Sequence, residues 1–399
     1  MFAAFAANGN KVFGYDINTK TRKNLKIKKA PVSETDLAKE IELGFNNYTI
    51  LDRPEYVVKN SEVIYIIVPT PSLIDGTFDT QYLENVIENL KNIDCDCTEK
   101  LLVITSTVLP GDTRSKLISK VRIIDKPISS IKFCYSPEFI ALGSVIKDLK
   151  NPDFLLVGEE TPNCADSHIK AMMSIIEDKN IPVRKMSIES AEMAKISINA
   201  YITSKISFAN AIGLTAESIT SCCPKDVLSA IGSDSRIGSK YLSKGLGFGG
   251  PCFPRDNRAI QQVINRVPNL NYNLPIDNEN FNKDLPNFYA HKIQRICDKK
   301  NIKNILIVGL TYKDGSYLLE ESQAYSIALK LSLLNKVFYF DPDATSLVEV
   351  ENITKFEKDT DIQGSLLLLN CSRDIKKIEF VRKIITNKNQ EFIEVDIWK

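Results

Sequence analysis

Apolar residues occur in short continuous runs through the first part of the chain, and each run ends at polar residues, glycine or proline. Such runs predict strands that are covered on both faces of a sheet. They lie at residues 62–68, 101–105, 131–135 and 154–157, after a shorter run at 11–16. Segments with apolar residues at helical spacing lie between them, as at 81–91 and 112–119. This alternation predicts a doubly wound parallel sheet.

The pattern changes in the middle of the chain and then returns. Residues 190–222 form one long helical pattern with few breakers, and Pro268, Pro275 and Pro286 mark a boundary after it. Beyond residue 287, strands are expected at 304–308, 337–340 and 365–370, with helices at 291–297 and 322–334. We therefore expect an α/β protein with two Rossmann-like, doubly wound parallel-sheet domains. A long central helix and a helical region join them, which divides the chain at 1–186, 187–286 and 287–399.

Composition excludes several classes of function. The 51 basic and 50 acidic side chains balance, so nothing attracts the chain generally to nucleic acid or anionic membranes. There are only two histidines and no paired CxxC motifs, so no metal site is expected. The nine scattered cysteines fit a reducing cytosol. We expect no membrane span, because no apolar run reaches the roughly 18 residues that one needs. Residues 1–7 lack the basic start of a signal peptide.

Four candidate residues follow predicted strands of the first sheet, namely Asp16, Thr70, Thr107 and Glu138. Ligands of parallel sheets bind beyond the carboxyl ends of the strands. An acid at the position of Asp16 could accept hydrogen bonds from the ribose of a dinucleotide. An ordinary strand-end acid explains Asp16 equally well.

The segment 245–256 contains four glycines in its first six positions, then Cys252 and Asp256. A loop without Cβ atoms can bring backbone amides to phosphate or sugar oxygens. A cysteine at its rim is well placed to act as a nucleophile. The alternative is a flexible surface turn beside a buried thiol.

Lys195 and Asn199 lie four residues apart in the long helical pattern, on one helix face. Together they could hold an oxygen atom or a water. The spacing by itself favours a simpler interpretation, a solvated helix face.

Motifs along nearly the whole chain resemble those of one family, the UDP-glucose/GDP-mannose dehydrogenases, and they occur in the same order. They are nearest to the UDP-glucose 6-dehydrogenase type. They occur at residues 15–18, 68–71, 106–108, 136–139, 143–148, 191–199, 234–238, 247–256 and 309–313. The resemblance implies NAD binding by 1–186, dimerisation and the catalytic cysteine in 187–286, and UDP-sugar binding by 287–399.

The resemblance also implies a four-electron, NAD-dependent oxidation of the C6 alcohol of a nucleotide sugar to the carboxylate. UDP-glucose is the expected substrate and UDP-glucuronate the product, for polysaccharide precursor synthesis. Cys252 would form a thiohemiacetal and then a thioester. Lys195, Asn199 and Asp256 would form a polar cluster. Within it, Lys195 would steady the developing oxyanion, and Asp256 would act as base, directly or through a water. Glu138 would assist thioester hydrolysis, and Thr107 would hold a water.

By resemblance, the cofactor contacts are Asp16, Val68, Thr70, Pro71, Ser106, Thr107 and Arg255. The substrate contacts are Glu138, Phe139, Ile140, Lys195, Asn199, Arg236, Ser243, Gly245, Gly247, Phe248, Gly249 and Lys313. Arg236 matches a residue that reaches the sugar nucleotide from the neighbouring subunit, so a homodimer or higher oligomer is expected. The cysteine usage adds the expectation of a cytoplasmic location.

The sequence departs from the family pattern at its start and near the cofactor. The first strand and its glycine fingerprint do not precede Asp16, since residues 1–9 resemble the end of the first helix. Leu142 and Glu320 stand where the family has glutamate and arginine. Two alternatives therefore stay open. One is a catalytically silent relative that binds a nucleotide sugar as a sensor or partner subunit. The other is a dehydrogenase for another UDP- or GDP-sugar.

Overall fold

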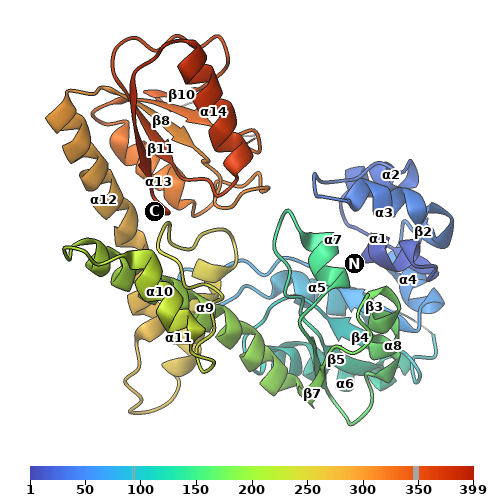
Figure 1. Ribbon diagram of the computed structural model, residues 1–399. Coiled ribbons are helices and arrows are strands. Elements are labelled where there is room, and N and C mark those ends of the chain that lie inside the picture. Colours follow the sequence, from blue (N-terminus) through green and yellow to red (C-terminus); the bar gives the residue numbers. More distant parts are fainter. Residues whose placement is uncertain (92, 94, 345–349) are drawn as a thin grey trace. The chain divides into compact units, whose positions relative to one another are not determined.

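The computed structural model describes all residues from 1 to 399 except 92, 94 and 345–349. The chain divides into two compact units, Met1–Ser197 and Ile198–Lys399. The division falls within one continuous helix, α9 (Ile188–Glu217) (Figure 1). Each unit contains its own five-stranded sheet, in line with the predicted fold class.

The first unit is built on a sheet in the order β3-β4-β5-β6-β7. Its strands are β3 (Val63–Ile66), β4 (Leu101–Ile104), β5 (Lys132–Tyr135), β6 (Leu155–Glu159) and β7 (Val183–Ser187). Its helices are α4 (Pro54–Asn60), α5 (Gln81–Leu90), η2 (Thr113–Ile118, a π-helix), α6 (Ser119–Arg122), η3 (Pro127–Ser130), α7 (Val145–Lys150) and α8 (Asp166–Ile175). Alternate residues of β4 join different clusters, Leu102 and Ile104 on one face, Leu101 and Val103 on the other. Both faces are covered, which explains the continuous apolar runs.

One strand pair departs from the expected parallel arrangement. β6 lies antiparallel to β5, with Cys134 opposite Glu159. The connection 136–154 contains only the short helix α7. A parallel pairing needs a crossover back to the other end of the sheet, and this connection makes none.

A second, two-stranded parallel sheet precedes the first, formed by β1 (Val12–Gly14) and β2 (Tyr48–Ile50). The accompanying helices are α1 (Phe2–Ala7), α2 (Thr19–Lys26), α3 (Leu37–Leu43) and η1 (Phe45–Asn47). Helix α1 packs in both directions. Its Ala3 and Ala6 contact the cluster around Ile41, and its Ala4 and Phe5 belong to the cluster that covers the larger sheet.

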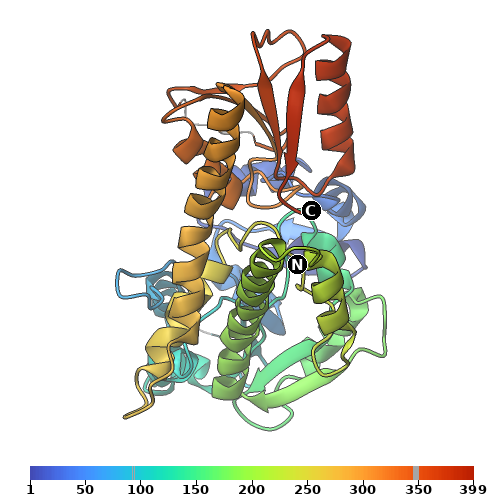
Figure 2. The same cartoon turned by 60° about the vertical axis from the view of Figure 1, so that its left-hand side comes forward.

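The second unit contains a fully parallel sheet in the order β10-β9-β8-β11-β12. Its strands are β8 (Asn304–Val308), β9 (Lys336–Phe340), β10 (Ile353–Lys355), β11 (Leu366–Asn370) and β12 (Phe392–Asp396). The helices are α10 (Pro224–Ser233), α11 (Phe253–Ile264), α12 (Leu274–Lys300), α13 (Gln323–Leu331) and α14 (Ile375–Asn387). Helices α12 and α13 pack on one face of the sheet and α14 on the other (Figure 2).

Helix α12 is longer than the sequence predicts, because it begins at Leu274 and continues through Pro286. A proline inside a helix has no N–H for the carbonyl four residues earlier. That carbonyl, on Asn282, instead accepts a hydrogen bond from the side chain of Gln323 at 3.1 Å. The buried acceptor is therefore satisfied and the helix continues. The three-domain division of the chain stays a prediction.

Candidate functional site

The glycine-rich loop of the second unit is held in place by polar side chains of two helices. Gly245 N donates to Asn210 Oδ1 at 2.8 Å, and Tyr289 Oη donates to the Gly245 carbonyl at 3.0 Å. Asn282 pairs with both backbone groups of Phe248, at 2.8 and 2.9 Å. The loop is thus a fixed structure, which contradicts the interpretation as a flexible turn.

Two of its glycines lie too close to the segment after β8 to carry a side chain. A Cβ on Gly249 would lie 2.4 Å from the carbonyl oxygen of Glu321. A Cβ on Gly250 would lie 2.5 Å from the Tyr312 ring, and Gly250 has a φ of +75°. Gly250 N also donates to the Glu320 carbonyl at 3.1 Å. The loop therefore packs directly on the segment 309–322 that follows β8.

Cys252 lies exposed at the N-cap position of α11. The positive end of the helix dipole favours a negatively charged thiolate there. Asp256 N donates to the Cys252 carbonyl at 2.9 Å, so the acid lies one turn into the helix. The Asp256 carboxylate is fully buried and accepts from Asn199 Nδ2 at 2.6 Å and from Arg255 Nε at 3.0 Å. The structure thus brings together four predicted site residues, Cys252, Asp256, Asn199 and Arg255.

Glu138 and Lys195 meet in the first unit. Lys195 Nζ donates to the backbone carbonyl of Glu138 at 2.7 Å and lies 4.2 Å from the centre of the Phe139 ring. Glu138 Oε1 is buried and has no hydrogen-bond partner among the described residues. Burial raises the pKa of Glu138 to about 7, against the opposing effect of nearby cations such as Lys195. A carboxyl group in this state can exchange a proton near neutral pH.

Apart from Asp16, the predicted cofactor residues of the first unit occupy the loops after β3 and β4. Ser106 Oγ accepts from Val68 N at 2.9 Å and donates to the Val68 carbonyl at 2.7 Å. Thr70 Oγ1 donates to the Thr107 carbonyl at 2.7 Å. These bonds join the two loops at the carboxyl edge of the sheet, where a parallel sheet binds its ligand.

Asp16 lies just beyond β1 and lines a cavity of about 240 Å³. Apolar side chains of Leu25, Ile41 and Ile50 also line this cavity, as does Arg22. The Arg22 guanidinium donates to the Asp16 backbone carbonyl. An acid beside an apolar cavity suits a ligand in which a flat ring adjoins a group that carries hydroxyls.

Other predicted substrate contacts do not come together into one site within either unit. Arg236 is highly exposed (86% of its side chain) and pairs with Asp234 of its own loop at 2.6 Å. Lys313 lies exposed in the loop after β8, and Ile140 is also exposed. Ser243, at the start of the glycine-rich loop, accepts from Arg373 Nη2 at 2.8 Å. The joining of the Glu138 group and the Cys252 group into one catalytic site stays a prediction.

The sequence pattern did not single out the residues that hold the glycine-rich loop, Asn210, Asn282 and Tyr289. Asparagines buried within helices are unusual unless they bond to something, so Asn210 and Asn282 carried a weak signal. Their partners lie 34 or more residues away in sequence, and only the fold identifies them.

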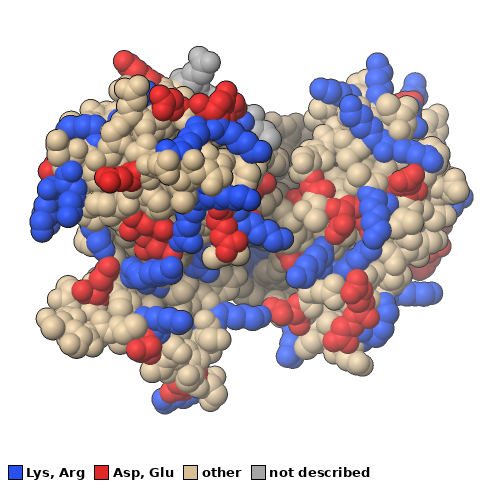
Figure 3. Space-filling view, turned by 45° about the horizontal axis from the view of Figure 1, so that its top comes forward, with Lys and Arg blue, Asp and Glu red and all other residues tan. Residues whose placement is uncertain are grey.

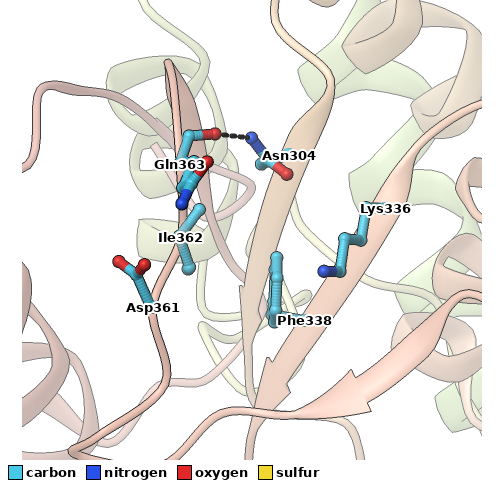
Figure 4. Close-up of a pocket in the computed structure, with 6 residues that line it drawn as sticks. All are labelled: Asn304, Lys336, Phe338, Asp361, Ile362 and Gln363. Carbon is cyan, nitrogen blue, oxygen red and sulfur yellow. Dashed lines mark hydrogen bonds between the residues drawn. The ribbon is translucent and has the colours of Figure 1, made fainter.

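A further cavity, of about 270 Å³, lies elsewhere in the second unit (Figure 4). Its lining includes Asn304 and Lys336, which begin β8 and β9, together with residues 361–363. It therefore opens at the amino ends of the strands, opposite the edge where parallel sheets bind ligands.

Basic and acidic side chains are interspersed on the surface in Figure 3.

The described residues contain neither a candidate membrane span nor a candidate metal site. None of the helices there is long and apolar enough to cross a membrane. Over the same part of the chain, no group of three or more His, Cys, Asp or Glu side chains could hold a metal ion.

Comparison with known proteins identifies the class as an NAD-binding dehydrogenase. Residues 1–177 match the NAD binding domain of the UDP-glucose/GDP-mannose dehydrogenase family, and residues 189–283 match its central domain. UDP-glucose 6-dehydrogenase AglM of Haloferax volcanii is 30% identical over 356 residues, covering 86% of this chain and 80% of that protein. GDP-mannose 6-dehydrogenase of Pseudomonas putida is 25% identical over 398 residues, covering 97% and 87%. The chain belongs to the UDP-glucose/GDP-mannose dehydrogenase family.

A solved UDP-glucose dehydrogenase from Pyrobaculum islandicum has the same fold, with a TM-score of 0.80 at 23% identity. The alignment covers 100% of this chain and 90% of that one. The residues of the first unit fit the NAD expected for this family. Asp16 and its apolar cavity suit the adenosine end, and the joined loops after β3 and β4 lie at the edge where the rest would bind.

Proposed function

We propose that this protein oxidises the C6 alcohol of UDP-glucose to the carboxylate, giving UDP-glucuronate. The reaction consumes one water and two NAD and releases two NADH and three protons. NAD supplies the chemistry of hydride acceptance in both oxidations. The observation that carries the proposal is the arrangement of Cys252 and Asp256 at the start of α11, with Asn199 of α9 bonded to Asp256.

The Asp256 carboxylate is proposed to accept the proton of the C6 hydroxyl, directly or through a water, in the first oxidation. Asn199 and Arg255 hold this carboxylate in one orientation. The Cys252 thiolate then adds to the aldehyde carbon and forms a thiohemiacetal. The second oxidation leaves a thioester on Cys252. The Lys195 ammonium stabilises negative charge on the substrate oxygen.

Water releases the product by attack on the thioester, and Glu138 is proposed to take the proton of that water. Its unpartnered Oε1 and its pKa of about 7 suit a group that accepts a proton near neutral pH. The thiol of Cys252 regains a proton as the carboxylate leaves. Thr107 would help to hold this water.

The proposal includes a homodimer. Arg236 has no partner within its chain other than Asp234 among the described residues, and its exposed position suits a contact across subunits. Tyr201 and Phe208 are exposed on α9 (65% and 49%) and lie seven residues apart, hence on one face. A cytoplasmic location and a role in supplying acidic sugars for polysaccharides complete the proposal.

The test is a count of NADH formed per sugar consumed, with UDP-glucose and excess NAD. Two NADH per sugar with UDP-glucuronate as product supports the proposal. Turnover of GDP-mannose or UDP-N-acetylmannosamine in preference to UDP-glucose would replace the substrate and keep the chemistry. Binding of UDP-glucose without any NADH from any of these sugars would establish a silent relative instead.

A further inference from the structure

A buried lysine occupies the first turn of α14, where a cation is unfavourable. Helix α14 starts after Asp374, and Lys377 lies only two residues beyond its first residue. The positive end of a helix dipole repels a cation. The Lys377 side chain is nevertheless 7% exposed. A residue placed against its local preference in this way needs a compensating interaction, and such residues often serve a function.

Three aspartates compensate Lys377. Its Nζ lies 3.1 Å from Asp314, 2.9 Å from Asp341 and 2.7 Å from Asp343. Burial alone would lower the pKa of Lys377, but hydrogen bonds and charges of these carboxylates raise it above its ordinary value. The lysine is therefore a cation at the centre of three anions.

The aspartates come from the carboxyl edge of the sheet. Asp341 follows β9 directly, and Asp314 lies in the loop after β8. We call residues 309–316, which contain Asp314, the anchor loop. Without the lysine, three carboxylates within reach of one point would repel one another.

Each carboxylate also holds backbone amides. Asp341 Oδ2 accepts from Leu310 N at 2.8 Å and Thr311 N at 2.9 Å, at the start of the anchor loop. Asp343 Oδ2 accepts from Gly315 N at 3.0 Å, near its end. Both ends of the anchor loop are therefore tied to carboxylates that Lys377 neutralises.

A third carboxylate ties the anchor loop to the segment after β11. Asp314 accepts from Ser372 Oγ at 2.6 Å and from Arg373 N at 2.8 Å. Lys377 therefore connects three separate segments at the carboxyl edge of this sheet.

The anchor loop supports the glycine-rich loop that leads to Cys252. It carries Tyr312, whose ring leaves no space for a Cβ on Gly250, two residues before Cys252. Tyr312 N donates to the Leu318 carbonyl at 3.1 Å, which joins the anchor loop to the segment that receives Gly250 N. The anchor loop also carries Lys313, a predicted contact of the nucleotide sugar.

We propose that Lys377 is a positioning residue for the oxidation, which fixes the anchor loop and through it the placement of Lys313 and Cys252. The proposal rests on the function proposed above. Lys377 itself touches none of the reacting atoms. It acts through Asp314, Asp341 and Asp343 on the loop against which Gly250 packs.

The test compares Lys377→Met with Lys376→Met, an exposed neighbour on the same helix. Lys377→Met is expected to raise the KM for UDP-glucose by roughly 10- to 100-fold, because small displacements of a substrate-positioning group cost this much. UDP should also protect Cys252 less well from alkylation by iodoacetamide. Lys376→Met should leave both quantities unchanged. A lowered Tm of Lys377→Met with unchanged KM and unchanged protection would overturn the proposal.

If Lys377→Met does not fold, Asp343→Asn provides a second variant. Asp343 is partly exposed (33%), and its substitution removes only one of the three carboxylates. It should weaken the hold on Gly315 and raise KM in the same direction by a smaller factor. An unchanged KM and unchanged UDP protection in this variant would also contradict the proposal. Alkylation of Cys252 with and without UDP needs no turnover. If the wild-type protein produces no NADH, the proposed function fails while the alkylation assay still tests the role of Lys377.

Discussion

The side-chain amide of Asn199 donates to the carboxylate of Asp256, with 2.6 Å between Nδ2 and Oδ2. Asn199 lies on α9 and Asp256 on α11, so the bond joins two helices through buried groups. The second oxygen of Asp256 accepts from Arg255 at 3.0 Å. The carboxylate is thereby held in one orientation, one helical turn from Cys252.

A double-mutant cycle on Asn199 and Asp256 tests this relationship. Asn199→Ala leaves a buried carboxylate with one donor fewer and should lower the free energy of unfolding by about 1–3 kcal/mol. The double variant Asn199→Ala/Asp256→Ala should lose less than the sum of the two single changes. Urea denaturation measures all four proteins. Strict additivity would show that the two groups do not interact in solution.

Cys252→Ser should separate the two oxidation steps. A serine cannot readily form the thioester, so we expect at most one NADH per sugar. The rate of carboxylate formation should fall by more than roughly 10³-fold, as for other lost nucleophiles. Cys223→Ser is the matched control, because Cys223 is also exposed and precedes a helix. Product analysis by mass spectrometry decides the outcome, and full UDP-glucuronate formation by Cys252→Ser would exclude covalent catalysis at this residue.

Thioester hydrolysis should depend on the ionisation of Glu138. Burial raises the pKa of Glu138 to about 7, and only the carboxylate form can accept a proton from water. The rate of product release should therefore rise with pH through about 7. In Glu138→Gln this rise should be absent, and a thioester on Cys252 should accumulate in intact-protein mass spectra. An identical pH profile in both proteins would assign the step to another group.

Gly250→Ala should lower the stability of the protein and raise the KM for UDP-glucose more than Gly364→Ala does. Gly250 (φ +75°) and Gly364 (φ +84°) both have left-handed backbones, but only at Gly250 would a Cβ meet the Tyr312 ring at 2.5 Å. Gly364→Ala should cost about 1 kcal/mol of strain, and Gly250→Ala about 1–3 kcal/mol more from the collision. Thermal unfolding and the KM for UDP-glucose measure this. Partial recovery in Gly250→Ala/Tyr312→Ala would identify Tyr312 as the cause, and equal effects of the two single variants would argue against it.

Stability should fall between pH 6.5 and pH 4 because of His168. Burial lowers the pKa of His168 to about 4, and its Nδ1 lies 3.0 Å from Tyr65 Oη. The unfolded chain binds a proton there below about pH 6.5, whereas the folded chain does not. The neutral, buried form therefore contributes stability that is present above pH 6.5 and is lost by roughly 3 kcal/mol on approaching pH 4.

The difference in pH dependence between wild type and His168→Gln measures this contribution. The variant should lose less stability over this range than the wild type. His291→Gln, at an exposed position on α12, serves as the control. Parallel pH–stability curves for wild type and His168→Gln would disprove the assignment.

Local patterns predicted the α/β fold class because strands covered on both faces need continuous apolar runs, as in β4 and β11. They failed where the outcome depended on distant partners. Helix α12 continues through Pro286, where the Asn282 carbonyl has no backbone donor and accepts a hydrogen bond from the distant Gln323 instead. The antiparallel β5–β6 pair likewise depends on the path of the connection between them.

The sequence by itself determined the α/β fold class, the family and the candidate groups, because residue types at fixed spacing carry that information locally. Cys252 and Asp256 are four residues apart, and a helix start places them one turn from each other. Only the tertiary structure decided what surrounds them. The hold of Asn210 and Asn282 on the glycine-rich loop, the burial of Glu138 and the aspartates around Lys377 all join residues far apart in sequence. Hydrogen bonds and desolvation act over a few ångströms in space, so no local pattern specifies them.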